Sequence, residues 1–159
     1  DDAGRILALD LTLASRCGFS ADLSGPINDR AMFHADNAYW LPDVAIHSYR
    51  CRTNTVSDTA FRGFGGPQGM FAIEAVIDAS ARATGLDPLD VRKANFYGTI
   101  GRNVTPYGML VEDNVIHELV AELDAAIRAQ PKLTALLQQD MHDCAPLEAS
   151  REQLLHTLT

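Results

Sequence analysis

The stretch that decides the fold is T-A-F-R-G-F-G-G-P-Q-G, residues 59–69, which runs directly into the apolar sequence M-F-A-I-E-A-V-I. It sets one arginine and two phenylalanines among four glycines and a proline. Glycine adopts positive φ angles easily, and proline is favoured in the first turn of a helix. The pattern therefore predicts a tight turn and then a helix from Pro67 to about Thr84, with Gly85 as its stop.

A glycine-rich turn at the start of a helix has two interpretations. Its backbone N–H groups lie at the positive end of the helix dipole and suit an anion, or the glycines only permit close packing. No Lys-Ser/Thr pair follows as in a Walker A loop, and Gln68 stands where a GxGxxG motif needs its third glycine. Classical nucleotide binding is therefore weakly supported, and the turn alone does not decide between anion binding and packing.

Working outward, the alternating sequence I-L-A-L-D-L-T-L-A predicts a half-buried strand over residues 6–14, and A-I-H-S-Y-R-C-R predicts a second over 45–52. Residues 1–5 predict a hairpin turn with Gly4 at positive φ. Three further helices are predicted: one capped by Asn28 or Asp29 and ending before Pro42, one from Asp87 to Gly98, and one with apolar periodicity over residues 116–127. Without regular βαβ alternation, these elements favour an α+β fold, a mixed sheet whose two strands pack against the helix over 67–84.

Composition limits the function. The 159 residues are 47% hydrophobic and 21% charged, which is ordinary for a globular protein. A net charge of −8, with the Lys and Arg residues scattered, argues against nucleic acid as a partner. No apolar run reaches the roughly 20 residues of a membrane span. The three cysteines are widely spaced and odd in number, which favours free thiols and a cytoplasmic location.

Several longer motifs carry a family resemblance. N-D-R-A-M-F-H-A-D-N-A-Y (28–39), T-N-T-V-S-D-T-A-F-R-G-F-G-G-P-Q-G-M (53–70), D-P-L-D-V-R-K-A-N-F-Y-G (87–98) and R-N-V-T-P-Y-G-M (102–109) occur in the family's order. Together they closely resemble the molybdenum-binding subunit of xanthine dehydrogenase, a molybdenum hydroxylase. The resemblance runs from Asp1 to about Ala126. It implies that residues 1–128 are part of a molybdopterin-binding domain, and it leaves residues 129–159 as a helical tail of unknown role.

The resemblance implies roles for four residues. Arg62 and Gly63 are expected to hold the cofactor, with the backbone of Arg62 beside the molybdenum. Phe64 is expected to stack on a flat heteroaromatic substrate, and Arg30 to point its guanidinium at the exocyclic oxygen of a purine. Taken alone, Phe64 would be an ordinary core residue and Arg30 a surface residue. The glutamate motifs that the family uses in catalysis do not occur here, and acids such as Glu74 are expected at ordinary solvent or capping positions, so no residue is assigned as catalytic.

The implied function is hydroxylation of hypoxanthine or xanthine towards urate, with electrons passed to iron–sulfur and FAD groups on a partner domain or subunit. The cofactor implied is molybdenum–molybdopterin. Because the first hairpin lacks its other strand and the catalytic glutamates are missing, the chain is expected to be an interior fragment that is inactive by itself. The alternative is a non-catalytic remnant that folds or associates without binding cofactor. A weaker alternative keeps the family but takes an aldehyde or another N-heterocycle as substrate.

Overall fold

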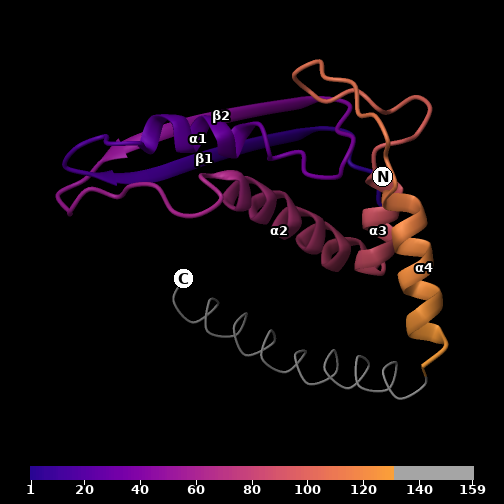
Figure 1. Ribbon diagram of the computed structural model, residues 1–159. Helices are drawn as coiled ribbons and strands as arrows, with labels where there is room; N and C mark the ends of the chain where they lie inside the picture. Colours follow the sequence, from indigo (N-terminus) through magenta and orange to yellow (C-terminus); the bar gives the residue numbers. More distant parts are fainter. Residues whose placement is uncertain (131–159) are drawn as a thin grey trace. The chain divides into compact units, whose positions relative to one another are not determined.

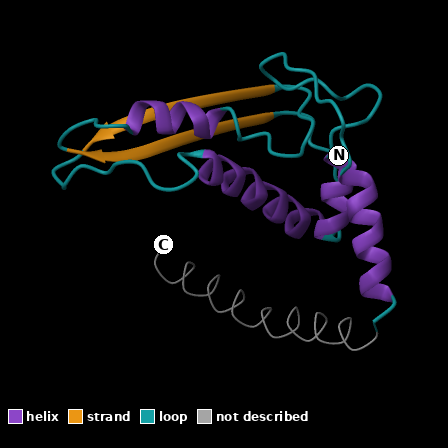
Figure 2. Cartoon of the chain, in the orientation of Figure 1, coloured by secondary structure: helices purple, strands orange, loops and turns teal. Residues whose placement is uncertain are grey.

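The computed structural model describes residues 1–130, which form an α+β arrangement and confirm the predicted fold class (Figures 1 and 2). The elements in chain order are β1 (Leu9–Gly18), α1 (Ser24–Met32), β2 (Val44–Arg52), α2 (Gly66–Thr84), α3 (Pro88–Asn95) and α4 (Ile116–Arg128). The chain divides into two compact units, Asp1–Asn114 and Val115–Thr159. The predicted tail over 129–159 lies almost wholly outside the described residues.

The sheet of the first unit is two-stranded and parallel, with Leu9 opposite Val44 and Arg16 opposite Cys51. Along β1 the leucines are half-buried and the residues between them are exposed, which confirms the predicted alternation. The strand begins at Leu9 rather than Ile6 and extends to Gly18. A parallel pair needs a crossover connection, and α1 provides it by lying against both strands (Figure 1).

The predicted position of α1 was wrong. The helix begins at Ser24 after Leu23, which offers no capping side chain, and it ends at Met32 instead of continuing towards Pro42. Asn28, expected as a helix cap, lies inside the helix and is 3% exposed. Its side-chain amide donates to Ser48 Oγ at 3.1 Å and to the Tyr49 carbonyl at 3.2 Å. Asn28 therefore fixes α1 to β2 through buried hydrogen bonds, which are costly to leave unmade.

The predicted helix over 67–84 is confirmed as α2, with Gly85 in the left-handed conformation at its end. The predicted packing of this helix against the two strands was wrong. Instead, α1 packs on both strands, and α2 packs on α1 and α3. The buried face of α2 is formed by Ile73, Ile77 and Ala81. Their spacing of four residues gives one apolar stripe, while the opposite face, including Phe71, is exposed.

The third helix begins as predicted, because the Asp87 carboxylate accepts from the Leu89 N–H at 2.7 Å and caps α3. Its Asn95, 1% exposed, accepts from the Ile6 N–H at 2.8 Å and donates to the Gly4 carbonyl at 2.8 Å. Gly4 has the expected positive φ, 75°. The N-terminal turn is thus attached to α3 by a buried side chain.

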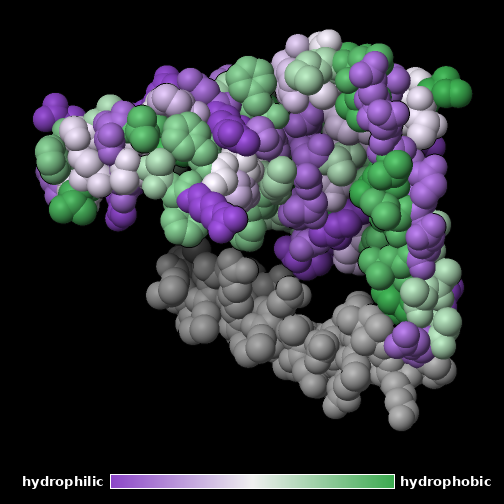
Figure 3. All heavy atoms as spheres, in the orientation of Figure 1, coloured by the Kyte–Doolittle hydropathy of each residue, from purple (hydrophilic) through white to green (hydrophobic). Residues whose placement is uncertain are grey.

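The second unit is described over residues 115–130 and contains α4. The predicted apolar periodicity is confirmed as a helix, and Figure 3 shows its hydrophobic residues gathered along one side. Leu119 and Leu123 on this helix are more than half exposed. Within the described part of the chain, no helix is both long and apolar enough to cross a membrane.

Candidate functional site

The glycine-rich turn before α2 has an unusual backbone. Three consecutive residues have positive φ: Gly63 at 91°, Phe64 at 50° and Gly65 at 96°. Two short hydrogen-bonded turns hold this conformation, from the Phe64 N–H to the Phe61 carbonyl at 2.9 Å and from the Gly66 N–H to the Gly63 carbonyl at 3.0 Å. A bulky residue such as phenylalanine rarely adopts this region, and such strain persists where the surroundings enforce it, often at functional sites.

Two glycines of the motif also permit α1 and α2 to approach closely. A Cβ atom at Gly65 would lie 2.0 Å from the Ile27 carbonyl oxygen, and one at Gly69 would lie 2.1 Å from the Ala31 carbonyl oxygen. Both distances are far below van der Waals contact, so only glycine fits. The packing interpretation of the glycines is therefore correct for these two positions, and the neighbour is α1.

The same motif leaves part of the first turn of α2 accessible, because Pro67 and Gln68 are exposed while Gly66 is buried. Among the described residues no side chain caps this helix, and Pro67 in its first turn has no N–H to satisfy. Arg62 and Gly63, just before it, are exposed. The N–H groups of Gly66 and Gly69 already donate to the carbonyls of Gly63 and Gly65, so it is chiefly the dipole of the 19-residue helix that favours an electron-rich group here. The anion interpretation thus remains compatible with the packing one.

Arg30 lies in the last turn of α1 and is exposed. Within the described residues its guanidinium makes no hydrogen bond or ion pair, so it is available to a ligand. Its neighbour Ala31 is the residue whose carbonyl faces Gly69, so the contact between the two helices brings the Arg30 segment to the start of α2. Phe64 is half-buried in the same region. The structure therefore places Arg30 and the glycine-rich turn on adjoining elements.

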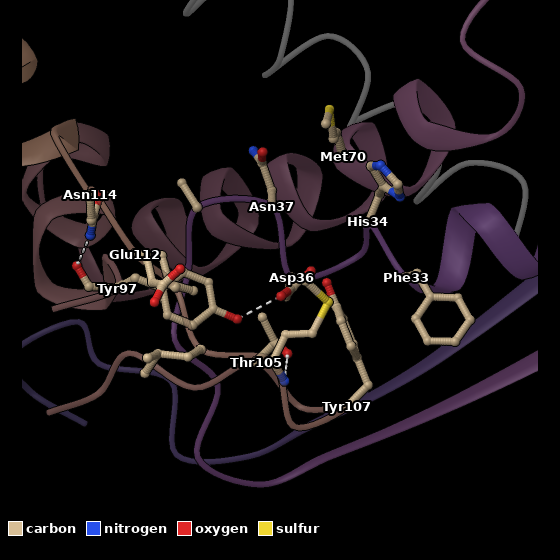
Figure 4. A pocket seen from close by; sticks show the side chains of 14 residues that line it. Phe33, His34, Asp36, Asn37, Met70, Tyr97, Thr105, Tyr107, Glu112 and Asn114 are labelled. Atoms are coloured by element: carbon tan, nitrogen blue, oxygen red, sulfur yellow. Dashed lines mark hydrogen bonds between the residues drawn. The ribbon is translucent and has the colours of Figure 1, made fainter. Parts of the chain in front are cut away.

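A cleft of about 440 Å³ lies beside α2, where Met70 lines it (Figure 4). His34 and Met70 border it on the side of α1 and α2, and the segment from Thr105 to Asn114 forms the opposite wall. None of the four residues expected to bind substrate or cofactor lines it. At its base, Asp36 is 5% exposed and accepts a 2.5 Å hydrogen bond from the Tyr97 hydroxyl.

The environment of Asp36 changes its acidity. Burial raises the pKa of its carboxyl group, and the hydrogen bond from Tyr97 partly opposes that increase. Burial also raises the pKa of the Tyr97 hydroxyl, with the Asp36 carboxylate adding to the effect. The two groups are 61 positions apart in the sequence, so no local pattern could have indicated the pair.

A second polar cluster corrects the expectation for Glu74. Its side chain is 33% exposed rather than solvent-facing, and it accepts from the Tyr39 hydroxyl at 2.6 Å and the Asn37 amide at 3.0 Å. Arg92 of α3 donates to Glu74 at 2.8 Å and to Asp78 at 2.7 Å. This network joins α2 to α3 and to the segment after α1, so Glu74 has a structural role that fixes α2 in place.

Comparison with known families identifies the chain. Residues 1–96 match the molybdopterin cofactor-binding domain, which is more than half of the sequence. The chain belongs to this family. A second model, the C-terminal domain of the type III secretion EscN ATPase, matches residues 121–156, of which the structure describes only the first ten.

Relatives of this molybdopterin cofactor-binding domain are molybdenum hydroxylases. The chain is 42% identical to xanthine dehydrogenase of Drosophila pseudoobscura over 84% of its own length and 10% of the relative. It is 38% identical to nicotinate hydroxylase of Emericella nidulans over 70% of its length and 8% of that enzyme. The aldehyde oxidoreductase structure from Desulfovibrio gigas superposes with a TM-score of 0.68 at 27% identity, over 80% of this chain and 14% of the oxidoreductase. The chain thus spans about a tenth of the curated relatives it matches.

Proposed function

We propose that this chain forms part of the substrate- and cofactor-binding region of a xanthine dehydrogenase-type molybdenum hydroxylase. In the complete enzyme the reaction would be oxidation of hypoxanthine or xanthine towards urate, with electrons passed to iron–sulfur and FAD partners. The observation that supports this most directly is the close contact of Gly65 and Gly69 with α1. It sets an unpaired arginine beside an uncapped, glycine-rich helix start.

The residues present fit a molybdopterin cofactor at the start of α2. The turn has three successive positive φ angles, Gly63 within it is exposed and offers its backbone without a side chain in the way, and the helix end behind it is electropositive. Arg62, through its backbone beside the metal, and Gly63 are the residues that would hold the group. When bound, the molybdenum cofactor supplies the redox centre that accepts electrons from the substrate.

In this proposal the side chains of Arg30 and Phe64 orient the purine. Arginine presents a planar, permanently charged fork that suits a carbonyl oxygen on which negative charge develops during the reaction. Phenylalanine offers a π face for offset stacking on a flat ring. The backbone of Phe64 has a positive φ that phenylalanine rarely adopts, which supports a binding role over simple core packing.

Two alternatives lead to different observations. A nicotinate- or aldehyde-oxidising enzyme, as the names of two relatives indicate for those proteins, would use the same cofactor with less dependence on Arg30. A remnant without cofactor would fold through the same helix contacts and contain no molybdenum. Measuring the molybdenum content distinguishes the remnant from the proposed enzyme. Measuring substrate preference distinguishes a nicotinate- or aldehyde-oxidising enzyme from a purine-oxidising one.

The test is Arg30→Met in the complete enzyme that contains this chain, with xanthine and benzaldehyde as substrates. Loss of a charge-assisted hydrogen bond to a developing oxyanion costs about 2 to 4 kcal/mol, so kcat/KM for xanthine should fall roughly 30- to 1000-fold. Benzaldehyde turnover and molybdenum content should change little. Arg5→Met, another exposed arginine of this unit, is the matched control and should leave both substrates unaffected. Equal losses on xanthine and benzaldehyde would refute the role of Arg30.

A further inference from the structure

The cleft beside α2 has a carboxylate at its bottom and a mainly apolar rim. Its 440 Å³ falls within the usual size of small-ligand sites, about 300 to 1,000 Å³. Fourteen residues line it, and none of them is a lysine or arginine. The charged groups that face it are Asp36, Glu112 and, when protonated, His34. The cleft therefore has acidic character and no permanently positive group.

The rim of the cleft provides an apolar and aromatic surface. Phe33 and Tyr107 meet edge to face, with ring centroids 5.0 Å apart and an interplanar angle of 83°. The side chains of Met70 and Met109 also line the cleft and are partly exposed. Thioethers and aromatic faces accommodate flat apolar groups, and aromatic faces also attract cations.

The wall formed by residues 105–114 is ordered by its own hydrogen bonds. The Thr105 N–H donates to the Met109 carbonyl at 2.8 Å, and the Met109 N–H donates to the Thr105 hydroxyl at 2.9 Å. The Asn114 amide donates to the Tyr97 carbonyl at 2.7 Å and joins the wall to the base. The cleft is thus preformed, which lowers the entropic cost of binding.

The carboxylate at the base is aimed into this space. Figure 4 shows the hydroxyl of Tyr97 pointing at Asp36, with the Tyr107 side chain on the other side of the carboxylate. Proximity to Asp36 contributes, after burial, to the raised pKa of the Tyr107 hydroxyl. A nine-tenths buried acid favours a positively charged partner, because an opposite charge offsets its lost hydration.

We propose that this cleft binds a cationic nitrogen attached to a flat apolar body, with Asp36 holding the charge and the aromatic–methionine rim holding the body. The site is separate from Arg30, Arg62, Gly63 and Phe64, and the inference does not depend on the function proposed above. An arylalkylamine and an arginine side chain adjacent to an aromatic residue share this chemistry. The first would be a free ligand and the second a segment of another polypeptide.

The experiment uses the full 159-residue chain labelled with ¹³C at its methionine methyl groups. Met70 and Met109 line the cleft and Met32 does not, so the methyl spectrum reports binding at this site specifically. Two probes are titrated: phenethylamine, and N-acetyl-phenylalanyl-arginine amide. Both should shift the Met70 and Met109 signals, assigned with Met→Leu variants, and leave Met32 unchanged, with a Kd on the order of 1 mM for phenethylamine. Tighter binding of phenethylamine would indicate a free amine as the ligand, and tighter binding of the dipeptide amide would indicate a segment of another polypeptide.

Charge is tested with a probe and with variants. 3-Phenylpropionate has the same apolar body and the opposite charge, and it should not shift the Met70 and Met109 signals. Asp36→Asn keeps an acceptor for Tyr97 and should weaken phenethylamine binding about tenfold. Asp113→Asn is the matched control, because Asp113 belongs to the wall segment but does not line the cleft, and this variant should bind as the parent chain does. Equal binding of 3-phenylpropionate, unchanged affinity in Asp36→Asn, or absence of shifts with both cationic probes would overturn the proposal.

Discussion

Gly69→Ala tests whether close contact of α1 and α2 sets the geometry of the glycine-rich turn. Gly69 lies within α2 and its φ is not positive, so alanine suits the backbone and would by propensity stabilise the helix by about 1 kcal/mol. The added Cβ, however, would lie 2.1 Å from the Ala31 carbonyl oxygen, where contact requires about 3.4 Å. The neighbour is backbone and cannot rotate away, so the two helices must separate by roughly 1 Å.

Overpacking of this kind costs about 1 to 3 kcal/mol, and it acts against the gain in propensity. We expect Gly69→Ala to lower the free energy of unfolding by up to about 2 kcal/mol, measured by urea denaturation of the chain with circular dichroism. The matched control is Gly25→Ala in α1, where no atom lies within 4 Å of the added Cβ. That variant should be as stable as the parent or slightly more stable. If Gly69→Ala were stabilised to the same extent as Gly25→Ala, the helices would not be in the contact described.

Two other predictions concern single carboxylates. Because the folded-state pKa of Asp36 is raised above 3.8, the folded protein binds a proton here more readily than the unfolded chain, and the ionised group costs stability once the pH exceeds that raised value. The stability of Asp36→Asn relative to the parent should therefore increase from about pH 4 to pH 7 in urea titrations, and a constant difference would contradict the burial effect. Asp87→Ala removes the N-cap of α3 and should cost about 1 kcal/mol, whereas Asp87→Asn, which can still cap, should cost much less; equal losses would contradict the capping role.

Local signals in the sequence predicted α2 and α3 well. Pro67 and Gly85 mark the ends of α2, and Asp87 caps α3, so each boundary depends on residues at that boundary. The start of α1 has no such signal, because Leu23 precedes it and offers no cap, and Asn28, which is a good capping residue, bonds to β2 instead. Once α1 was misplaced, the parallel pairing of β1 and β2 could not be foreseen.

The polar clusters were missed for a related reason. Glu74 lies on a helix at a position that local pattern assigns to solvent, yet its partners Tyr39 and Arg92 come from segments 35 and 18 residues away. Only the packing of α2 on its neighbours brings them together. The four residues implied by resemblance are a different case: their positions follow from motif matching, and their roles stay predictions until the Arg30 experiment is done.

The two interpretations of the glycine-rich turn are not exclusive. Gly65 and Gly69 allow α1 to touch α2, whereas Gly63 and the strained Phe64 shape the exposed turn before the helix. Packing and ligand binding therefore use different glycines of one motif. The buried apolar face of α2 holds the turn in place. The contact between α2 and α1 sets the distance from the turn to Arg30. A substitution at Gly69 changes that distance without altering any residue of the turn. In the complete enzyme it would therefore test the effect of the distance alone, with every proposed binding residue still present.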